Sequence, residues 1–490
     1  MMSRWTHLLI VCVVLLTAGV LVADAVVSIA SGLYLNFSSG VWLALARDAY
    51  DGVLYRPLWN GVEYGGTRYF PMLFVAIAGL MRAGVSPVTA GVTVSMLGLA
   101  AMVAAVFVLL KRLSVPSPLA MLGAALSAAP YFVHQTAFAV RSEPLAAAFA
   151  LSGLAVLAPI EKRPDSIKRE LAAATLFICA FLTKITCVYA PAAATLALLF
   201  VGRRRAATRL AVSTALGAIV ALALVNIASG GRAIESFRAC ALAGSTLSTL
   251  LSPVAITRTL YLIGVSHLLT VVFFLALLAF VMSARARRPL PALYFLTAVA
   301  VTGVIFTSPG TTVTGHIVDA YVAAIVLITA TIASHTGRIR TLGTVALITV
   351  AVWAAAQNVV LIAGMIKHGE VRERQEGWRQ LVTTLRDCHG SILSESPLIP
   401  LLADHRPIVL DPFAFRVVAI NHPEVVDDLT ARLKRREFAC VVLEHDPGTP
   451  GGYGWYSNVN LGDTVRDTLV QFYKYDQTVG GERFYRPQEQ

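Results

Sequence analysis

The sequence YLNFSSGVWLALARDAYDGVLYRPLWNGVEYGGTRYFP, residues 34–71, is a polar segment between two apolar regions. Its residues 42–46 place an apolar stripe on a short helix, which we expect to lie flat on a membrane surface. Arg47, Asp48 and Asp51 follow near the end of this helix, and its two carboxylates share one side. A carboxylate in this position could act as a general base toward an acceptor hydroxyl. The alternative is a solvated helix end in which Arg47 pairs locally.

The composition of the whole chain is that of a multi-span membrane protein. Of its 490 residues, 57% are hydrophobic and 14% are charged, whereas a soluble domain has about 25% charged residues. The formal net charge is +12, but residues 366–490 carry more acidic than basic side chains, so the positive excess belongs to residues 1–365. Short loops rich in Lys and Arg orient membrane spans, so this excess does not indicate nucleic acid binding.

About eleven apolar runs are candidates for membrane spans of roughly 20 residues each. They lie near residues 8–30, 86–110, 117–138, 143–160, 170–188, 189–202, 209–229, 259–282, 288–307, 317–334 and 342–364. The basic clusters between these runs fall on the same side as Arg4 only if a further short run, 69–84, does not cross the bilayer. We therefore expect a protein of the inner or plasma membrane with a cytoplasmic N-terminus and an extracytoplasmic tail. The length of the first run favours an uncleaved span over a signal peptide.

The fold class that follows is a mainly α membrane part, residues 1–365, and a small α/β extracytoplasmic domain, residues 366–490. In this tail the apolar periodicity predicts helices at 378–385 and 425–433, short strands at 391–393, 408–410 and 438–443, and a loop at 447–456. Cys388 and Cys440 are interpreted as two small buried thiols. A disulfide between them is the alternative, because the tail is expected outside the cytoplasm.

The same topology places four polar regions on the outer face, at 31–68, 134–143, 230–258 and 308–316. Ionisable residues close to the bilayer are costly and mark functional sites. Arg68 and Arg141 of these regions, and Lys184 near the outer end of the apolar run 170–188, are candidates for binding a phosphate group. Each has a plainer interpretation: a turn-capping arginine for Arg68, local pairing with Glu143 for Arg141, and snorkelling to water for Lys184.

His316 and Asp319 lie three residues apart and share one helical face at the outer membrane edge. They could bind an acceptor or a divalent cation, and a structural hydrogen bond between them is the alternative. No closely spaced group of metal ligands occurs in the sequence, so no cofactor is implied.

The order of a first span, a long outer loop with an amphipathic helix, the pattern DG-x-LYRP…GGTRYFP and an apolar run resembles the GT-C superfamily of polytopic glycosyltransferases. Its similar members are the dolichyl- or polyprenyl-phosphate-sugar-dependent mannosyl- and arabinosyltransferases. Three later segments agree with the resemblance, which extends over the whole membrane part: 141–144, 181–186 and 315–319.

The resemblance implies transfer of a sugar from a polyprenyl-phosphate donor to a glycan or lipid acceptor, with an acidic residue of the first outer loop as base. Many such loops carry this acid before the amphipathic helix, where this chain has Asn36-Phe37-Ser38-Ser39. The base is therefore expected at Asp48 or Asp51, unless the chain has lost this chemistry. The competing functions are a transporter or flippase for a lipid-linked sugar and a non-catalytic envelope assembly protein.

Overall fold

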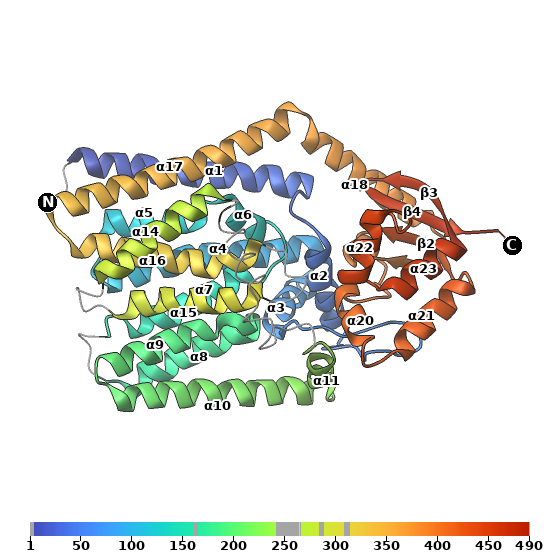
Figure 1. Ribbon diagram of the computed structural model, residues 1–490, viewed down its shortest axis with the longest axis horizontal. Helices are drawn as coiled ribbons and strands as arrows, with labels where there is room; N and C mark the ends of the chain where they lie inside the picture. The colour runs from blue at the N-terminus through green and yellow to red at the C-terminus, as the bar shows by residue number, and fades with distance from the viewer. Residues whose placement is uncertain are drawn as a thin grey trace.

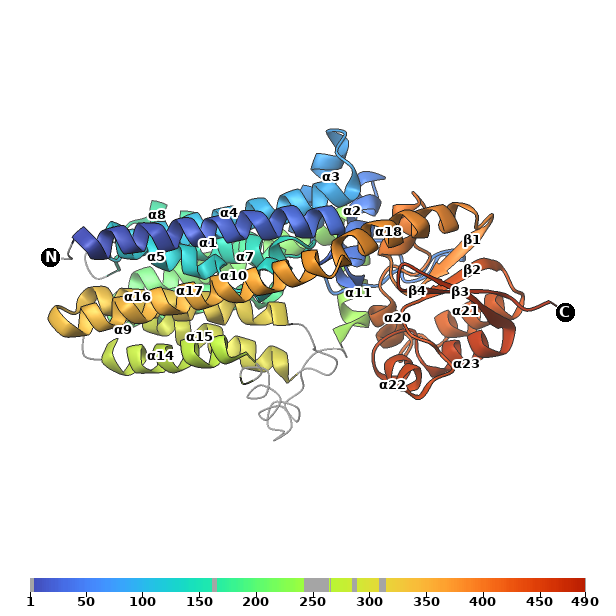
Figure 2. The ribbon, with the colours of Figure 1, turned by 90° about the horizontal axis from the view of Figure 1, so that it is seen from above.

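A computed structural model describes residues 4–160, 165–241, 264, 266–283, 289–307 and 314–489. Long helices lie side by side in a bundle, and an α/β domain packs against one end of that bundle (Figures 1 and 2). The N-terminus lies at the opposite end (Figure 1). The first part of the predicted span 259–282, and parts of the outer regions 230–258 and 308–316, fall outside the described residues.

The bundle helices correspond to the apolar runs of the sequence. They are α1 (Arg4–Ser31), α4 (Pro87–Arg112), α5 (Ser117–Ala128), α7 (Glu143–Leu157), α8 (Ile167–Thr183), α9 (Tyr189–Phe200), α10 (Arg204–Ala228), α14 (His267–Ser283), α15 (Pro289–Phe306), α16 (Val318–Ser334) and α17 (Gly337–Lys367). Six of the described helices are individually long and apolar enough to cross a membrane. The run 117–138 is divided at Pro130 into α5 and the short α6 (Tyr131–Ala137), because proline cannot continue the backbone hydrogen bonding of a helix.

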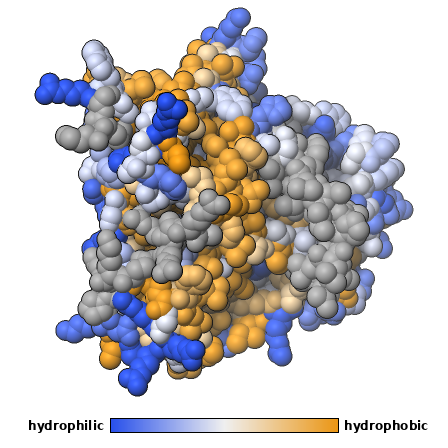
Figure 3. Space-filling model, turned by 60° about the vertical axis from the view of Figure 1, so that its left-hand side comes forward, coloured by the Kyte–Doolittle hydropathy of each residue, from blue (hydrophilic) through white to orange (hydrophobic). Residues whose placement is uncertain are grey.

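Apolar side chains cover much of the outer surface of the bundle, and hydrophilic residues border them (Figure 3). α16 forms the centre, since 89% of its apolar window is buried inside the protein, whereas α10 at the rim buries only 6% of its window. Leu216, Ile219 and Leu224 on α10 accordingly face outward. An apolar helix with this exposure fits a lipid environment.

The segment expected at the outer interface forms α3 (Pro71–Arg82), which has 12 residues. Its length of roughly 18 Å is well short of the hydrocarbon thickness of a bilayer. α3 packs beside α2 (Phe37–Tyr50) and α4 at the end of the bundle that faces the α/β domain (Figure 1). The structure therefore agrees with an apolar run that does not cross the membrane.

The amphipathic helix of the first loop is α2, but it does not lie on an open surface. Every residue from 41 to 46 is buried, so the predicted apolar stripe packs against other parts of the protein. α3 and α4 cover one side, and α19 (Leu398–Leu402) of the C-terminal domain covers another. Gly40 allows this packing, because a Cβ there would collide with the Leu398 backbone. The tail supplies this cover from far along the chain, which periodicity alone does not reveal.

The C-terminal domain is built on a four-stranded sheet in the order β1-β2-β4-β3. Its strands are β1 (Ser391–Ser394), β2 (Phe438–Leu443), β3 (Tyr473–Val479) and β4 (Glu482–Pro487), and its helices are α18 (Glu370–Arg386), α19, α20 (Pro412–Val418), α21 (Glu424–Lys434), α22 (Pro450–Asn458) and α23 (Asp463–Phe472). β1 and β2 are parallel, and the other two pairs are antiparallel. The predicted α/β class is confirmed, as are both predicted helices and the strands near 391 and 438.

Two predictions for the tail are wrong. Residues 408–410 do not join the sheet, because Val409 forms a bridge with Tyr64 of the first loop instead. Residues 447–456 are not all loop, since α22 begins at Pro450 after the Thr449 hydroxyl caps the Gly452 N–H. A helix start of this kind, with a threonine cap and a proline at the first position, is common.

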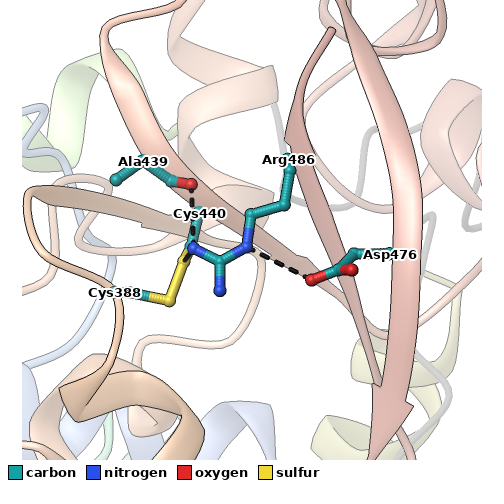
Figure 4. The surroundings of a disulfide bond; sticks show 5 residues. All are labelled: Cys388, Ala439, Cys440, Asp476 and Arg486. Atoms are coloured by element: carbon teal, nitrogen blue, oxygen red, sulfur yellow. Dashed lines mark hydrogen bonds and ion pairs between the residues drawn. A yellow bond between two sulfur atoms is a disulfide. The ribbon is translucent and has the colours of Figure 1, made fainter.

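Cys388 and Cys440 form a disulfide that connects the end of α18 to β2, with their Cα atoms 6.0 Å apart (Figure 4). The preferred interpretation as two buried thiols is therefore wrong. Arg486 packs over this bond, donating to Cys440 Sγ at 2.8 Å and to Asp476 Oδ2 at 3.2 Å. Nothing in the sequence near either cysteine identified its partner, which lies 52 residues away.

Candidate active site

Five charged or titratable side chains meet where the helices of the bundle end toward the C-terminal domain. Arg141 and Glu143 stand at the start of α7, Lys184 follows α8, His316 lies in η4 (Thr314–Ile317), and Asp319 lies in the first turn of α16. We call these five residues the helix-end cluster. Four of them are predicted site residues, and the fold brings them together from three separate segments.

The helix-end cluster consists of two buried ion pairs. Arg141 donates from Nε and Nη2 to both carboxylate oxygens of Glu143, at 3.2 and 2.9 Å. Lys184 Nζ donates to Asp319 Oδ2 at 2.8 Å, and the Tyr189 hydroxyl donates to Asp319 Oδ1 at the same distance. Buried charges are paired in this way because desolvating an isolated ion is costly.

His316 borders these pairs without joining them. Its Nδ1 lies 3.9 Å from Glu143 Oε1 and makes no hydrogen bond. The anticipated hydrogen bond between His316 and Asp319 does not form, because Lys184 and Tyr189 occupy the Asp319 carboxylate. A buried ring nitrogen without a partner is unusual and marks a place where a ligand group could bind.

A cavity of about 1140 Å³ opens between the first loop, α18 and the C-terminal domain. Asn36, which caps α2 by accepting from the Ser39 N–H, lines it just before that helix. Arg68 also lines this cavity and is exposed in it, with its guanidinium 4.4 Å from the centre of the Phe413 ring. Among the described contacts, Arg68 forms no ion pair. It is therefore a cation available to an anionic ligand.

Tyr69 connects the cavity to the helix-end cluster. It lines the cavity and packs on Trp42, with the two ring centres 4.3 Å apart. Burial raises the pKa of Tyr69, and the charge of Asp411 raises it further, whereas Arg68 and Arg141 lower it. Tyr69 thus lies within electrostatic range of the cavity wall on one side and of the cluster on the other.

Asp48 and Asp51 do not line the cavity. Asp48 is fully buried and accepts from Arg56 Nε and Nη2, both at 2.8 Å, and from Arg406 Nε and Nη2 at 3.0 and 2.8 Å. Asp51 pairs with Arg47 at 3.3 Å near the surface. The surroundings of Asp48 favour a structural role, because two guanidinium groups already saturate its carboxylate.

The donor set of the helix-end cluster does not fit a divalent cation. The oxygens of Glu143 and Asp319 face Arg141 and Lys184, so positive side chains occupy the directions that a metal would need. Within the described ranges, no three His, Cys, Asp or Glu side chains are grouped to hold a metal ion. We therefore derive no chemical step through a metal.

Sequence reasoning missed Asp411, a buried carboxylate that lines the cavity immediately before α20. Its Oδ1 accepts from the Ala414 N–H at 3.1 Å, and burial raises the pKa of this carboxyl group while Arg68 opposes the shift. The sequence Asp411-Pro412 does signal a helix start. Only the folded chain brings this residue to the first loop.

No protein-family model and no curated protein sequence matches the chain. Several solved structures do match the chain. ArnT from Cupriavidus metallidurans in the apo state has a TM-score of 0.59 at 14% identity, covering 96% of this chain and 98% of that one. The same protein bound to undecaprenyl phosphate has a TM-score of 0.57, with the same identity and coverage.

The archaeal oligosaccharyltransferase AglB from Archaeoglobus fulgidus, in complex with an inhibitory peptide and a dolichol-phosphate, is a further structural neighbour. Its TM-score is 0.54 at 13% identity, covering 96% of this chain and 74% of that one. An Archaeoglobus fulgidus oligosaccharyltransferase crystallised with Zn and sulfate has a TM-score of 0.55 at 14% identity, covering 93% of this chain and 71% of that one. At such identities the likeness concerns architecture alone: over nearly its whole length the chain has the same overall fold as these proteins.

Proposed function

We propose that this protein is a membrane glycosyltransferase of the GT-C type, which transfers a sugar from a polyprenyl-phosphate donor to a glycan or lipid acceptor on the outer face of the membrane. The observation that carries the proposal is the helix-end cluster beside a cavity that contains the unpaired Arg68. The fold supports it, because solved structures of its structural neighbours contain undecaprenyl phosphate or dolichol-phosphate.

In this proposal Arg68, Arg141 and Lys184 bind the donor phosphate and stabilise the charge that develops on it as the leaving group. Arg68 contributes a full positive charge, since no carboxylate neutralises it among the described contacts. Arg141 and Lys184 are paired, but each guanidinium or ammonium has more N–H donors than its carboxylate partner accepts. Their remaining donors are held in fixed directions by the ion pairs.

We assign Asp48 to holding the first loop against the C-terminal domain. Arg406 comes from that domain, and Arg56 Nη1 also donates to the Pro407 carbonyl at 2.8 Å. We assign no catalytic part to Asp51, which lies outside the cavity lining. His316 and Asp319 remain candidates for contacts with the donor or acceptor, since both belong to the helix-end cluster.

The proposed orientation has a cytoplasmic N-terminus and an extracytoplasmic C-terminal domain. The N-terminus and this domain lie at opposite ends of the bundle (Figure 1). The basic residues Lys111 and Arg112 stand at the C-terminal end of α4, and short loops rich in Lys and Arg favour the cytoplasmic side. The disulfide between Cys388 and Cys440 supports the orientation, because such bonds persist in oxidising compartments outside the cytoplasm.

The test uses the full chain in lipid vesicles with a polyprenyl-phosphate-linked sugar and envelope glycan or lipid acceptors. We expect glycosylated acceptor and released polyprenyl phosphate in equal amounts. Movement of the lipid-linked sugar across the bilayer without transfer would instead identify a flippase. If neither transfer nor movement is observed, the remaining function is that of a non-catalytic envelope assembly protein.

Arg68→Gln is the variant that tests the phosphate contact. Losing one charge-assisted hydrogen bond of about 1.5–3 kcal/mol should raise the KM for the donor roughly 10- to 100-fold. Arg435→Gln, an exposed arginine in the C-terminal domain outside the cavity, is the matched control and should keep the original KM. An unchanged donor KM in Arg68→Gln would exclude this residue from the phosphate site.

A further inference from the structure

We propose that Asp411, supplied by the C-terminal domain, is the general base that accepts the proton of the acceptor hydroxyl. The inference rests on the proposed function, since it names a catalytic residue for that reaction. It starts from the carboxylates that line the cavity among the described residues, which are Glu370, Glu373, Glu376, Asp411, Glu444 and Glu482. Asp411 is the only one of these six that is fully buried, whereas Glu482 is partly buried and the other four are exposed.

Backbone hydrogen bonds fix Asp411 against the first loop. The Tyr64 N–H donates to the Ile408 carbonyl at 2.8 Å, and the Leu410 N–H donates to the Tyr64 carbonyl at 2.9 Å. Asp411 is the next residue after Leu410, and Arg68 follows Tyr64 by four residues. The bridge therefore brings a carboxylate of the tail beside the cation proposed for the donor phosphate.

The Phe413 ring completes this arrangement. Arg68 stacks on it, and Phe413 stands two residues after Asp411 in the first turn of α20. The Arg68 charge is close enough to lower the pKa of Asp411 against the effect of burial. A general base must lie within hydrogen-bond reach of the hydroxyl that attacks the anomeric carbon, so it belongs in the same cavity as the donor phosphate.

The other five carboxylates of the cavity do not lie beside Arg68 and Phe413 in any described contact. Glu370, Glu373 and Glu376 lie on α18 and are exposed. Glu444 and Glu482 lie at the ends of β2 and β4, and neither forms a described ion pair or side-chain hydrogen bond. No described contact brings any of these five to Arg68 or Phe413.

Asp411 retains capacity to accept a proton. A carboxylate has about four lone-pair positions on its two oxygens, and helix capping by the Ala414 N–H uses one of them. Burial disfavours the charged form and raises the pKa of the Asp411 carboxyl group. A carboxyl group with a raised pKa holds a transferred proton better than one in water.

The step balances in atoms and electrons. A lone pair of the acceptor hydroxyl forms a bond to the anomeric carbon, and the bond from that carbon to the phosphate oxygen breaks, leaving its electron pair on the phosphate. The hydroxyl proton passes to the Asp411 carboxylate and from there to solvent or to the released phosphate. No oxidant, reductant or further reactant is required.

A purely structural Asp411 would act as the N-terminal cap of α20, and Asp411→Asn separates the two roles. Asparagine caps helices as well as aspartate does, but its amide does not accept the hydroxyl proton. We expect Asp411→Asn to keep the thermal unfolding midpoint and the binding of polyprenyl phosphate, and to lower kcat by roughly 10²- to 10⁴-fold. Asp404→Asn, an exposed carboxylate outside the cavity, should keep kcat.

Asp411→Ala allows a second measurement, chemical rescue, which would have no effect if Asp411 only capped α20. Formate added to this variant should restore part of kcat, because a small carboxylate can enter the vacated space and accept the proton. Transfer in the original chain together with a kcat above one tenth in Asp411→Asn would overturn Asp411 as the base and leave the proposed function standing. Absence of transfer in the original chain would overturn the proposed function itself, and the base with it.

Discussion

At the scale of single residues, the site is defined by which charges are paired and which are free. Asp48 binds two arginines from distant parts of the chain, whereas the described contacts of Arg68 give it an aromatic ring and no ion pair. A carboxylate enclosed by guanidinium groups stabilises structure, and an unpaired cation in a cavity can bind an anion. This distinction, rather than position in the sequence, separates structural from ligand-binding charges here.

Asp48→Asn should destabilise the protein without changing the chemistry. Removing one partner of a buried ion pair costs about 3–5 kcal/mol, because the remaining charges stay buried. We expect a lower thermal unfolding midpoint and faster proteolysis of the C-terminal domain, with kcat per folded molecule preserved. Asp51→Asn, at a half-exposed pair, should change stability by less than about 1 kcal/mol. A stable but inactive Asp48→Asn protein would return Asp48 to the role of base.

At the scale of elements, the short segment 408–410 connects the C-terminal domain to the first loop. It has the apolar pattern of a strand but bonds to Tyr64 instead of to the sheet. α2 is similarly completed by α19 from the tail. Each of these contacts joins the first loop to the C-terminal domain, so the cavity wall is shared between the two.

The end of β4 should respond to pH through Glu482. Burial raises the pKa of Glu482 to about 8, and the nearby Glu444 and Glu395 raise it further against Arg483. The unfolded chain loses this proton near its usual pKa of about 4.3. Between these two values the folded state binds more protons than the unfolded state, so stability falls as pH rises.

Glu482→Gln mimics the protonated form and should remove this dependence. We expect its thermal unfolding midpoint to exceed that of the original chain at pH 8 and to match it at pH 4. Glu489→Gln, near the end of the chain, is the control and should give the original profile. Equal midpoints for Glu482→Gln and the original chain at pH 8 would contradict a raised pKa at this position.

At the scale of the whole molecule, the first loop at one end of the helix bundle and the C-terminal domain together line the cavity. The bundle presents an apolar outer surface (Figure 3) and gathers its buried charges at one end. The C-terminal domain packs against that same end (Figures 1 and 2). In the proposed reaction, a lipid-linked donor and a glycan or lipid acceptor meet at the boundary between the two parts.

Protease accessibility should reveal the orientation of the molecule. In sealed vesicles with the outer face exposed, we expect added protease to digest the C-terminal domain, and in inverted vesicles we expect protection. A cytoplasmic domain of a control membrane protein should be protected in the vesicles with the outer face exposed and digested in the inverted vesicles. If the C-terminal domain is instead protected in vesicles with the outer face exposed and digested in inverted vesicles, the proposed topology is wrong.

The sequence by itself determined the membrane class, the candidate spans and the α/β class of the tail, and it predicted Arg141, Lys184, His316 and Asp319 as candidate site residues. It did so because apolar run length and the sparsity of charge near spans are local properties that the bilayer imposes directly. The tertiary structure alone decided the partners of each charge. Arg406 reaches Asp48 across 358 residues, and Val409 reaches Tyr64 across most of the chain. Such pairings follow from how the tail packs on the first loop, and no local pattern encodes them.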